Sequence, residues 1–401
     1  MTDSMELTTA YTPSRFAADN TLSNPQVTEK YKLAGNIVNA VLPQVLSRVA
    51  PGVSICDLCQ YGDDLINAHT SETFKSKDRG VAVPTCVSVN NIVQYSSPLL
   101  DSDYNLKPGD VVKVELGAHI DGYIATAAHT VIVNPEPSQP IQGRAADVVC
   151  ATHYALEAAI QMLRPGVKSS EITRVITEIA AYYRCKPVEG TFSSPMKRFV
   201  LRAGKDIENQ FPDDMIVQDL DKMDFQIEPN QVYQMNIVLT TGDGKTKTAE
   251  EKPHVFQRDV HKSYQLKMKG ARVAYAEIND KYTVFPFSAR ALTTKQARLG
   301  LSSLIQHELI TPYVPMRSSR TSDLVCQFKA TILVTPEGLV RTTCPQALPF
   351  VHSQYCIPTE TTAAQVLSAP SVVKVSPVKQ LSEVQVEFGN RRVENEDVEM
   401  E

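Results

Sequence analysis

One stretch of the chain, residues 111–130, carries residue types that suggest metal chemistry. Apolar residues alternate along both of its arms, and Asp121-Gly122 between them is a strong signal for a two-residue β-hairpin turn. In that hairpin Glu115 and Thr126 share one face and lie diagonally to each other, roughly 7–8 Å apart. Two carboxylates in these places could bridge a pair of metal ions. This chain offers one carboxylate and one threonine, so the functional question depends on that difference.

The bulk composition is that of a large globular protein. The chain has 401 residues, of which 42% are hydrophobic and 21% are charged, and this predicts one elaborated domain or two. Its net charge of −5 does not indicate nucleic-acid binding by the whole molecule, so such a role needs a local basic patch. We expect no membrane span, because no apolar run reaches about 18 residues, and no signal peptide. The eight scattered cysteines indicate a reducing compartment, and the one C-x-x-C pair, Cys56 and Cys59, is expected to pack inside a helix.

Four parts follow one another along the chain. Residues 1–25 are polar and predict a disordered arm. Residues 26–253 and 321–358 carry helix and strand patterns and predict one domain. Residues 254–320 interrupt that domain and predict a small, basic, helical insertion. Residues 359–401 are rich in Ser, Thr, Val and Pro and end acidic, which predicts a disordered tail.

The domain shows signs of an internal duplication. Two pairs of helical segments are each interrupted by the same tripeptide, Pro-Gly-Val, at 51–53 and at 165–167. In each half a proline then precedes an alternating strand, and Glu115 and Asn236 stand seven residues after these two prolines. We therefore expect two halves that share one sheet, with a cleft along their pseudo-twofold axis.

Several short motifs occur one after another within residues 26–355. They are Val83-Pro84-Thr85, Ser88-Val89-Asn90-Asn91, Gly109 to Gly117, Gly122-Tyr123-Ile124, Ala203-Gly204-Lys205 and Gln327-Phe328. With these motifs the chain resembles the type 2 methionine aminopeptidase-like fold. Three further phrases are Ala127 to Thr130, Thr240 to Lys245 and Tyr264 to Lys269. These make the chain most similar to the proliferation-associated, ErbB-receptor-binding proteins, described in fungi as curved-DNA-binding proteins. The resemblance implies an α/β pita-bread fold, with duplicated helix-helix-hairpin halves around a mixed, curved sheet.

The resemblance also implies where an active site would lie. An active enzyme of this fold holds two divalent metal ions with two Asp, one His and two Glu side chains, and the ions activate a bridging water. The matching positions in this chain are Glu115, Thr126, Thr191, Asn236 and Lys329, and two substrate-side histidine positions match Gln94 and Arg202. One of four ligand carboxylates remains, and a charged lysine cannot ligate a metal. We therefore expect no metal, no cofactor and no aminopeptidase activity, with Lys329 paired to Glu115 in place of the ions.

Two histidines of the hairpin do not restore the ligand set. His119 lies beside the turn, and His129 has the opposite parity to the candidate site residues, so it points to the other face of the sheet. We expect both to be packing or surface residues.

The insertion carries a basic stretch with interleaved aromatic residues. Its members are Lys252, Arg258, Lys262, Tyr264, Lys267 and Lys269, with Phe256 close by. Such a stretch suits contact with a phosphate backbone and stacking of bases. The alternative is a solvated loop whose charges only keep it soluble, and the residues by themselves do not separate the two interpretations.

The resemblance implies a non-enzymatic adaptor in the cytoplasm and nucleus. Its expected partners are RNA and large ribosomal subunits or their precursors, and also DNA, with a role in ribosome biogenesis, translation or growth control. Two alternatives stay open: an adaptor that binds peptides or proteins in the empty cleft, and a hydrolase with altered chemistry. The acidic residues 394–401 differ from the lysine-rich tail of animal members, which argues against tail-driven RNA binding and nucleolar targeting.

Overall fold

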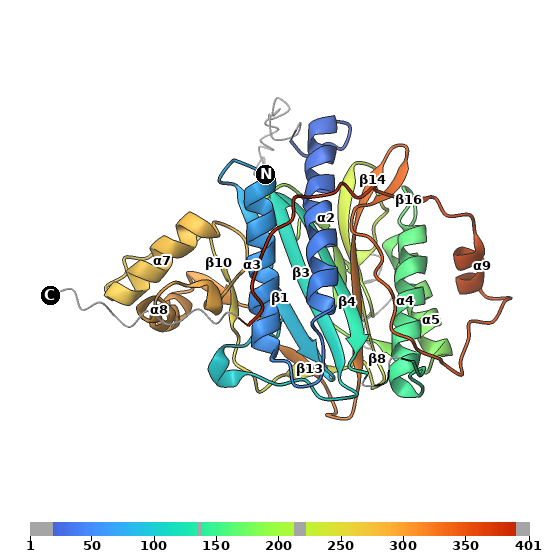
Figure 1. Ribbon diagram of the computed structural model, residues 1–401. Helices are drawn as coiled ribbons and strands as arrows, with labels where there is room; N and C mark the ends of the chain where they lie inside the picture. Colours follow the sequence, from blue (N-terminus) through green and yellow to red (C-terminus); the bar gives the residue numbers. More distant parts are fainter. Residues whose placement is uncertain (1–18, 135, 137, 212–221, 390–401) are drawn as a thin grey trace, which may run out of the picture.

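A single large sheet forms the centre of the molecule (Figure 1). The computed structural model describes residues 19–134, 136, 138–211 and 222–389, and within these residues the sheet has ten strands. Its main path is β1 (Arg79–Val89), β3 (Val111–Ile120), β4 (Tyr123–Ile132), β14 (Val325–Thr335), β8 (Gln231–Thr240), β6 (Phe192–Met196) and β7 (Ile207–Glu208). Neighbours along this path are antiparallel. The sheet is mixed, because β15 (Gly338–Arg341) pairs with β16 (Val373–Val375) in parallel; β5 (Lys186–Pro187) pairs with β8.

Four helices cover one face of this sheet (Figure 1). They are α2 (Pro25–Leu46), α3 (Ile55–Thr73), α4 (Arg144–Met162) and α5 (Ser169–Tyr182). Alternate strand residues, such as Val112, Val114 and Leu116 of β3, bury their side chains against α2 and α3. The residues between them, including Glu115, therefore point to the opposite face. None of the helices that the structure describes has the length and apolar character needed to cross a bilayer.

The β3–β4 hairpin has the predicted register. Ile120 is opposite Tyr123, and Glu115 is opposite Ala128. Asp121 and Gly122 both have positive φ, at 53° and 79°, as a type I′ turn requires.

The duplication is visible in how α3 and α5 begin. Asp103, five residues before Pro108, accepts a hydrogen bond from the backbone N–H of Cys56 in the first turn of α3, at 3.0 Å. Asp224, five residues before Pro229, accepts one from the backbone N–H of Ser170 at the start of α5, also at 3.0 Å. Each half therefore caps its second helix with a carboxylate that lies just before the following strand.

The insertion has a core of its own. The sequence pattern predicted a helical insertion, but the structure also has strands there. The insertion contains α7 (Lys269–Lys281), η2 (Ala289–Ala291), α8 (Lys295–Gln306) and a sheet of β10 (Val255–Arg258), β11 (Phe287–Ser288) and β12 (Ile310–Pro312). Beside it, β13 (Met316–Ser318) pairs with β2 (Ile92–Gln94) and β9 (Thr246–Thr248), so this end of the predicted insertion joins the main domain. Arg290 of η2 anchors the insertion through a buried ion pair with Asp63 of α3.

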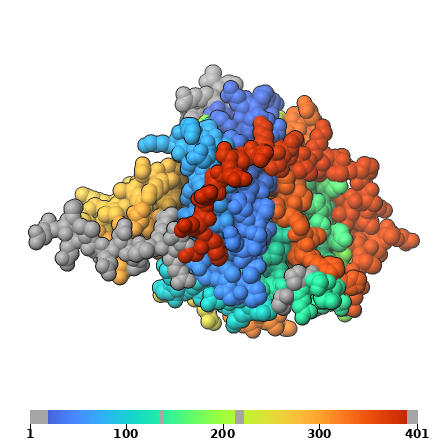
Figure 2. Space-filling model, in the orientation of Figure 1, coloured from blue at the N-terminus to red at the C-terminus, as the bar shows by residue number. Residues whose placement is uncertain are grey.

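Most of the segment predicted to be a disordered tail is packed, and this corrects the prediction for residues 359–389. It forms α9 (Thr362–Ser368) and β16, and it then crosses the helical face of the molecule (Figures 1 and 2). The crossing is stabilised by Leu381, Val384, Val386 and Phe388, which pack against the α2–α3 core. Val384, Val386 and Phe388 alternate with polar residues, and this alternation was the sign in the sequence that the segment could pack. Residues 390–401 lie outside the described residues, as do residues 1–18, which are most of the predicted N-terminal arm.

One further short element, η1 (Leu100–Ser102), lies between β2 and β3.

Candidate functional site

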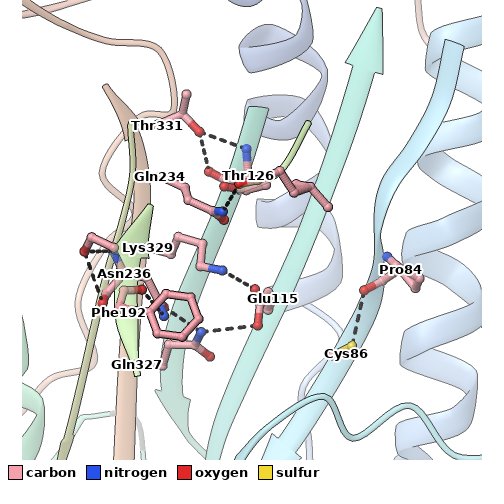
Figure 3. A network of polar contacts seen from close by, with 12 residues as sticks. Pro84, Cys86, Glu115, Thr126, Phe192, Gln234, Asn236, Gln327, Lys329 and Thr331 are labelled. Carbon is pink, nitrogen blue, oxygen red and sulfur yellow. Dashed lines mark hydrogen bonds and ion pairs between the residues drawn. The ribbon is translucent and has the colours of Figure 1, made fainter. Parts of the chain in front are cut away.

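Four side-by-side strands place the candidate site in one row. Glu115 of β3 is opposite Ala128 of β4, Ala128 is opposite Lys329 of β14, and Lys329 is opposite Asn236 of β8. This row lies on the face of the sheet away from α2–α5, and the close-up in Figure 3 shows Glu115, Lys329 and Asn236 pointing toward one another. The duplication thus brings Glu115 and Asn236, one from each half, to the same row.

A continuous polar network connects this row. Lys329 Nζ forms an ion pair with Glu115 Oε1, as predicted. The amide of Gln327 donates to the second oxygen of Glu115 at 3.2 Å and to the side-chain oxygen of Asn236 at 2.8 Å. The Asn236 amide in turn donates to the carbonyl of Phe192 at 3.3 Å. Glu115 and Lys329 are only 2% and 8% exposed, so the pair is largely buried.

The network forms part of the wall of an open cleft of about 620 Å³. Five of the seven predicted degenerate positions line it: Gln94, Glu115, Arg202, Asn236 and Lys329. Tyr95 and Tyr313, edge to face at a centroid distance of 4.9 Å, form part of its aromatic wall. Burial raises the pKa of both phenols, that of Tyr313 to about 12, so both stay neutral at physiological pH.

Thr126 and Thr191 are buried but do not line the cleft. The backbone N–H of Thr126 donates to Thr331 Oγ1 of β14 at 2.9 Å, and that hydroxyl donates back to the Thr126 carbonyl. Thr191 donates its hydroxyl to the Val188 carbonyl at 2.6 Å and accepts from the Asn209 amide at 2.8 Å. Both threonines thus support the backbone around the site.

Arg202 and the insertion supply the positive charge at the cleft. Arg202 is paired with Asp206, and its guanidinium lies 4.0 Å from the centroid of the Phe192 ring. Arg258 of β10 lines the same cleft, with its guanidinium 5.5 Å from the Tyr275 ring centroid. The insertion therefore forms one wall of the cleft, a relationship that the linear sequence did not reveal.

The donor set does not fit a pair of divalent metal ions. Among the described residues no three His, Cys, Asp or Glu side chains are grouped as metal ligands. Glu115 is the one carboxylate of the row, and the Lys329 ammonium bound to it has no lone pair to offer a metal.

The hairpin histidines pack as predicted. His119 stacks on Phe285 at a centroid distance of 4.2 Å, and His129 contacts the Ala347 carbonyl on the helical side at 3.1 Å. Burial lowers the pKa of His119 to about 3 and that of His129 to about 4, so both rings are neutral at physiological pH. His129 lies on the face of the sheet opposite the Glu115–Lys329 row, and the ring of His119 is covered by Phe285.

The predicted basic patch is partly rearranged. Lys252, Lys267 and Lys269 are exposed, and Tyr264 is exposed and stacked on His307 at a centroid distance of 3.7 Å. Lys262 forms an exposed ion pair with Glu308, which reduces its net contribution. Phe256 is buried in the core of the insertion, so the expectation that it interleaves with the lysines for base stacking is wrong. Alternation along β10 turns the Phe256 side chain toward the core of the insertion. Which face of β10 meets that core is clear only from the strands that pair with it.

Gln327 and the two cleft tyrosines were missed as site residues from the sequence. Gln327 stands two residues before Lys329, so strand parity could have placed it on the same face. Tyr95 and Tyr313 come from segments 218 positions apart and carried no common signal.

The fold and this cleft define the class of protein. Residues 29–266 match the model of metallopeptidase family M24, and the chain belongs to that family. It is 39% identical to proliferation-associated protein A of Dictyostelium discoideum, over 89% of this chain and 92% of the relative. It is 43% identical to ERBB-3 binding protein 1 of Solanum tuberosum, over 80% and 82%. It is 34% identical to the curved DNA-binding protein of Schizosaccharomyces pombe, over 83% and 87%.

Solved structures confirm the predicted pita-bread fold. A thermophilic Arx1 superimposes with a TM-score of 0.78 at 25% identity, over 86% of this chain and 99% of that chain. A methionine aminopeptidase from Thermotoga maritima gives a TM-score of 0.52 at 19% identity, over 80% and 98%. The resemblance inferred from short motifs therefore holds at the level of family and fold.

Proposed function

We propose that this protein is a catalytically inactive member of family M24 that binds RNA and ribosomal particles through its insertion. The observation that carries the first half is the buried Glu115–Lys329 ion pair at the place where an active relative holds its metals. A lysine there supplies one positive charge in place of two dications, and it cannot activate a water as a metal ion does. The proposed role is in ribosome biogenesis, translation or growth control, in the cytoplasm and nucleus.

The insertion supports the second half. Lys267 and Lys269 lie on either side of Met268, the N-cap of α7, so Lys269 is the first residue of the helix, and the first turn also carries Arg272. The N-terminus of a helix has a partial positive charge, which adds to that of the side chains and favours phosphate groups. Tyr264, 46% exposed and stacked on His307, offers a ring face next to this charge.

Loss of catalysis is tested with purified protein. We expect no hydrolysis of Met-peptides with added cobalt or manganese, and no stoichiometric metal. Two bound ions per chain, together with hydrolysis that Glu115→Ala abolishes, would overturn the proposal.

Particle binding is tested by co-sedimentation with large ribosomal subunits over a series of salt concentrations. Neutralising Lys262, Lys267 and Lys269 to Gln should weaken binding and reduce the slope of log K against log salt by about 2. The control neutralises three exposed lysines outside the insertion, Lys75, Lys77 and Lys374. Equal co-sedimentation of both triple variants with the parent chain at low salt would refute the assignment.

The cleft supports a second candidate, a site for an extended peptide or a protein segment. The cleft has a volume of about 620 Å³, and Tyr95, Tyr313 and Phe192 form part of its wall. A peptide site predicts that Tyr313→Ala lowers partner capture and leaves ribosome binding unchanged.

A further inference from the structure

A groove between α3 and α8 has two walls of opposite charge. Asp57 and Asp64 of α3 line one side, and Lys295 and Arg298 of α8 line the other. The groove has a volume of about 430 Å³. It is separate from the Glu115–Lys329 row and lies between the main domain, which supplies α3, and the insertion, which supplies α8.

Apolar side chains line the groove together with these charges. Leu99 and Leu100 contribute from the segment between β2 and β3, at the start of η1, and Leu299 contributes from α8. Leu100 is 52% exposed and Leu299 is 67% exposed. An occupant of this groove therefore needs an apolar residue between groups of opposite charge.

The packed end of the chain leads into this groove. Phe388 lies edge to face on Tyr61 of α3 at a centroid distance of 5.3 Å. The Arg48 guanidinium lies over both rings, at 5.8 Å from that of Tyr61 and 5.5 Å from that of Phe388. Glu387 and Gly389, on either side of Phe388, line the groove itself. The twelve residues that follow begin at its edge and can extend over about 40 Å.

The order of residue types in that following segment matches the groove. Arg391 and Arg392 come first, Val393 follows, and Glu394, Glu396 and further acids complete residues 390–401. We propose that residues 390–401 are an intramolecular ligand of the α3–α8 groove. The two arginines meet the acidic α3 wall, Val393 meets the leucines, and the acids meet the basic α8 wall.

This occupancy would have a physical consequence for the insertion. The segment ties α8 to α3 and covers Leu100 and Leu299. Because it is tethered at Phe388, its effective concentration at the groove is on the order of millimolar. Another molecule reaches the groove only by displacing it.

The test uses a chain that ends at Gly389, the full chain, and a labelled peptide of residues 390–401. Fluorescence anisotropy at low salt should show that the peptide binds the shortened chain. It should bind the full chain at least about tenfold more weakly, because the attached segment competes. Equal binding to both chains, or binding to neither, would overturn the proposal.

Charge reversal tests the assigned walls. In the shortened chain Lys295→Glu should weaken peptide binding about fivefold, whereas Lys374→Glu on β16, an exposed matched control, should not. A peptide carrying Glu394→Lys should recover affinity for the Lys295→Glu chain. Equal losses in both variants would show non-specific attraction and would contradict the site. Circular dichroism checks that each variant folds, and faster amide exchange in α8 of the shortened chain is an independent readout.

Discussion

Lys329 of β14 and Glu115 of β3 both lie opposite Ala128 of β4, and their side chains meet as a buried ion pair. The pair crosses the seam between the two halves of the duplicated fold. On either side of it, the hydroxyls of Thr130 and Thr331 also bridge β4 and β14, each through both a backbone N–H and a carbonyl. Side chains thus join the halves at the place where the family resemblance would put metal ions.

This relationship predicts a large stability cost for breaking the pair. Lys329→Met leaves the Glu115 carboxylate buried without its cation, and we expect a loss of about 3–5 kcal/mol in the free energy of unfolding. The double variant Lys329→Met, Glu115→Gln removes both charges and should recover much of that loss. Urea unfolding of the four proteins of this cycle measures the coupling, and single-variant losses below about 1 kcal/mol would contradict the prediction.

The two carboxylate caps predict matched and local effects. Asp103→Ala should destabilise the start of α3, and Asp224→Ala the start of α5, each by about 1–2 kcal/mol. Amide exchange should rise at Ser54 to Leu58 in the first variant and at Ser169 to Thr173 in the second. Each variant serves as the control for the other, and a rise at both helices in either variant would show that the caps are not local.

Lys113 predicts a dependence of stability on pH. Its side chain is 1% exposed and donates to the carbonyls of Asn90 and Val325 at 3.0 and 3.1 Å. Burial lowers the pKa of Lys113 to about 7, so from about pH 7 to about 10 the unfolded chain binds a proton that the folded chain has released. Stability should therefore rise with pH in this window, with a contribution of up to about 1.4 kcal/mol per pH from this group.

Urea unfolding at pH 7, 8 and 9 measures this contribution. Lys113→Met should flatten the slope, whereas Lys75→Met, at an exposed position, should leave it unchanged. Parallel slopes for the Lys113→Met and parent chains would show that Lys113 keeps its proton in the folded state.

Arg290 predicts how firmly the insertion is held. It donates to Asp63 at 2.9 Å and to Ser97 at 2.7 Å, and Asp63 also accepts from the Thr85 N–H at 2.7 Å. Arg290→Met leaves Asp63 buried and unpaired, so we expect a loss of about 3–5 kcal/mol and earlier proteolysis within residues 255–312. The loss should be smaller at pH 5 than at pH 8, because protonation relieves the buried carboxylate.

The control for this prediction lies on the same insertion. Lys281→Met removes a pair with Glu277 in which the lysine is 44% exposed, and it should change stability by less than about 1 kcal/mol because Thr293 still donates to Glu277. A cleavage pattern that is the same in both variants would mean that Arg290 does not anchor the insertion.

Local sequence determined the hairpin and the chemistry of its row. Asp121-Gly122 fixes the turn, the turn fixes the register, and strand alternation then places Glu115 on the cleft face. The family resemblance matches Lys329 to a ligand carboxylate, and a charged lysine offers no lone pair to a metal. These conclusions depend on neighbours along the chain, so the sequence is sufficient for them.

Only the tertiary structure decided which distant segments meet. It makes β10 a wall of the cleft, buries Phe256, and packs Val384 to Phe388 on α2 and α3. Burial depends on the surface that a segment finds, and that surface is assembled from residues far away in the chain. For this reason the ion pair of the row was expected from the sequence, whereas the cleft wall formed by the insertion was not, and the alternation of Val384, Val386 and Phe388 did not show which surface they pack against.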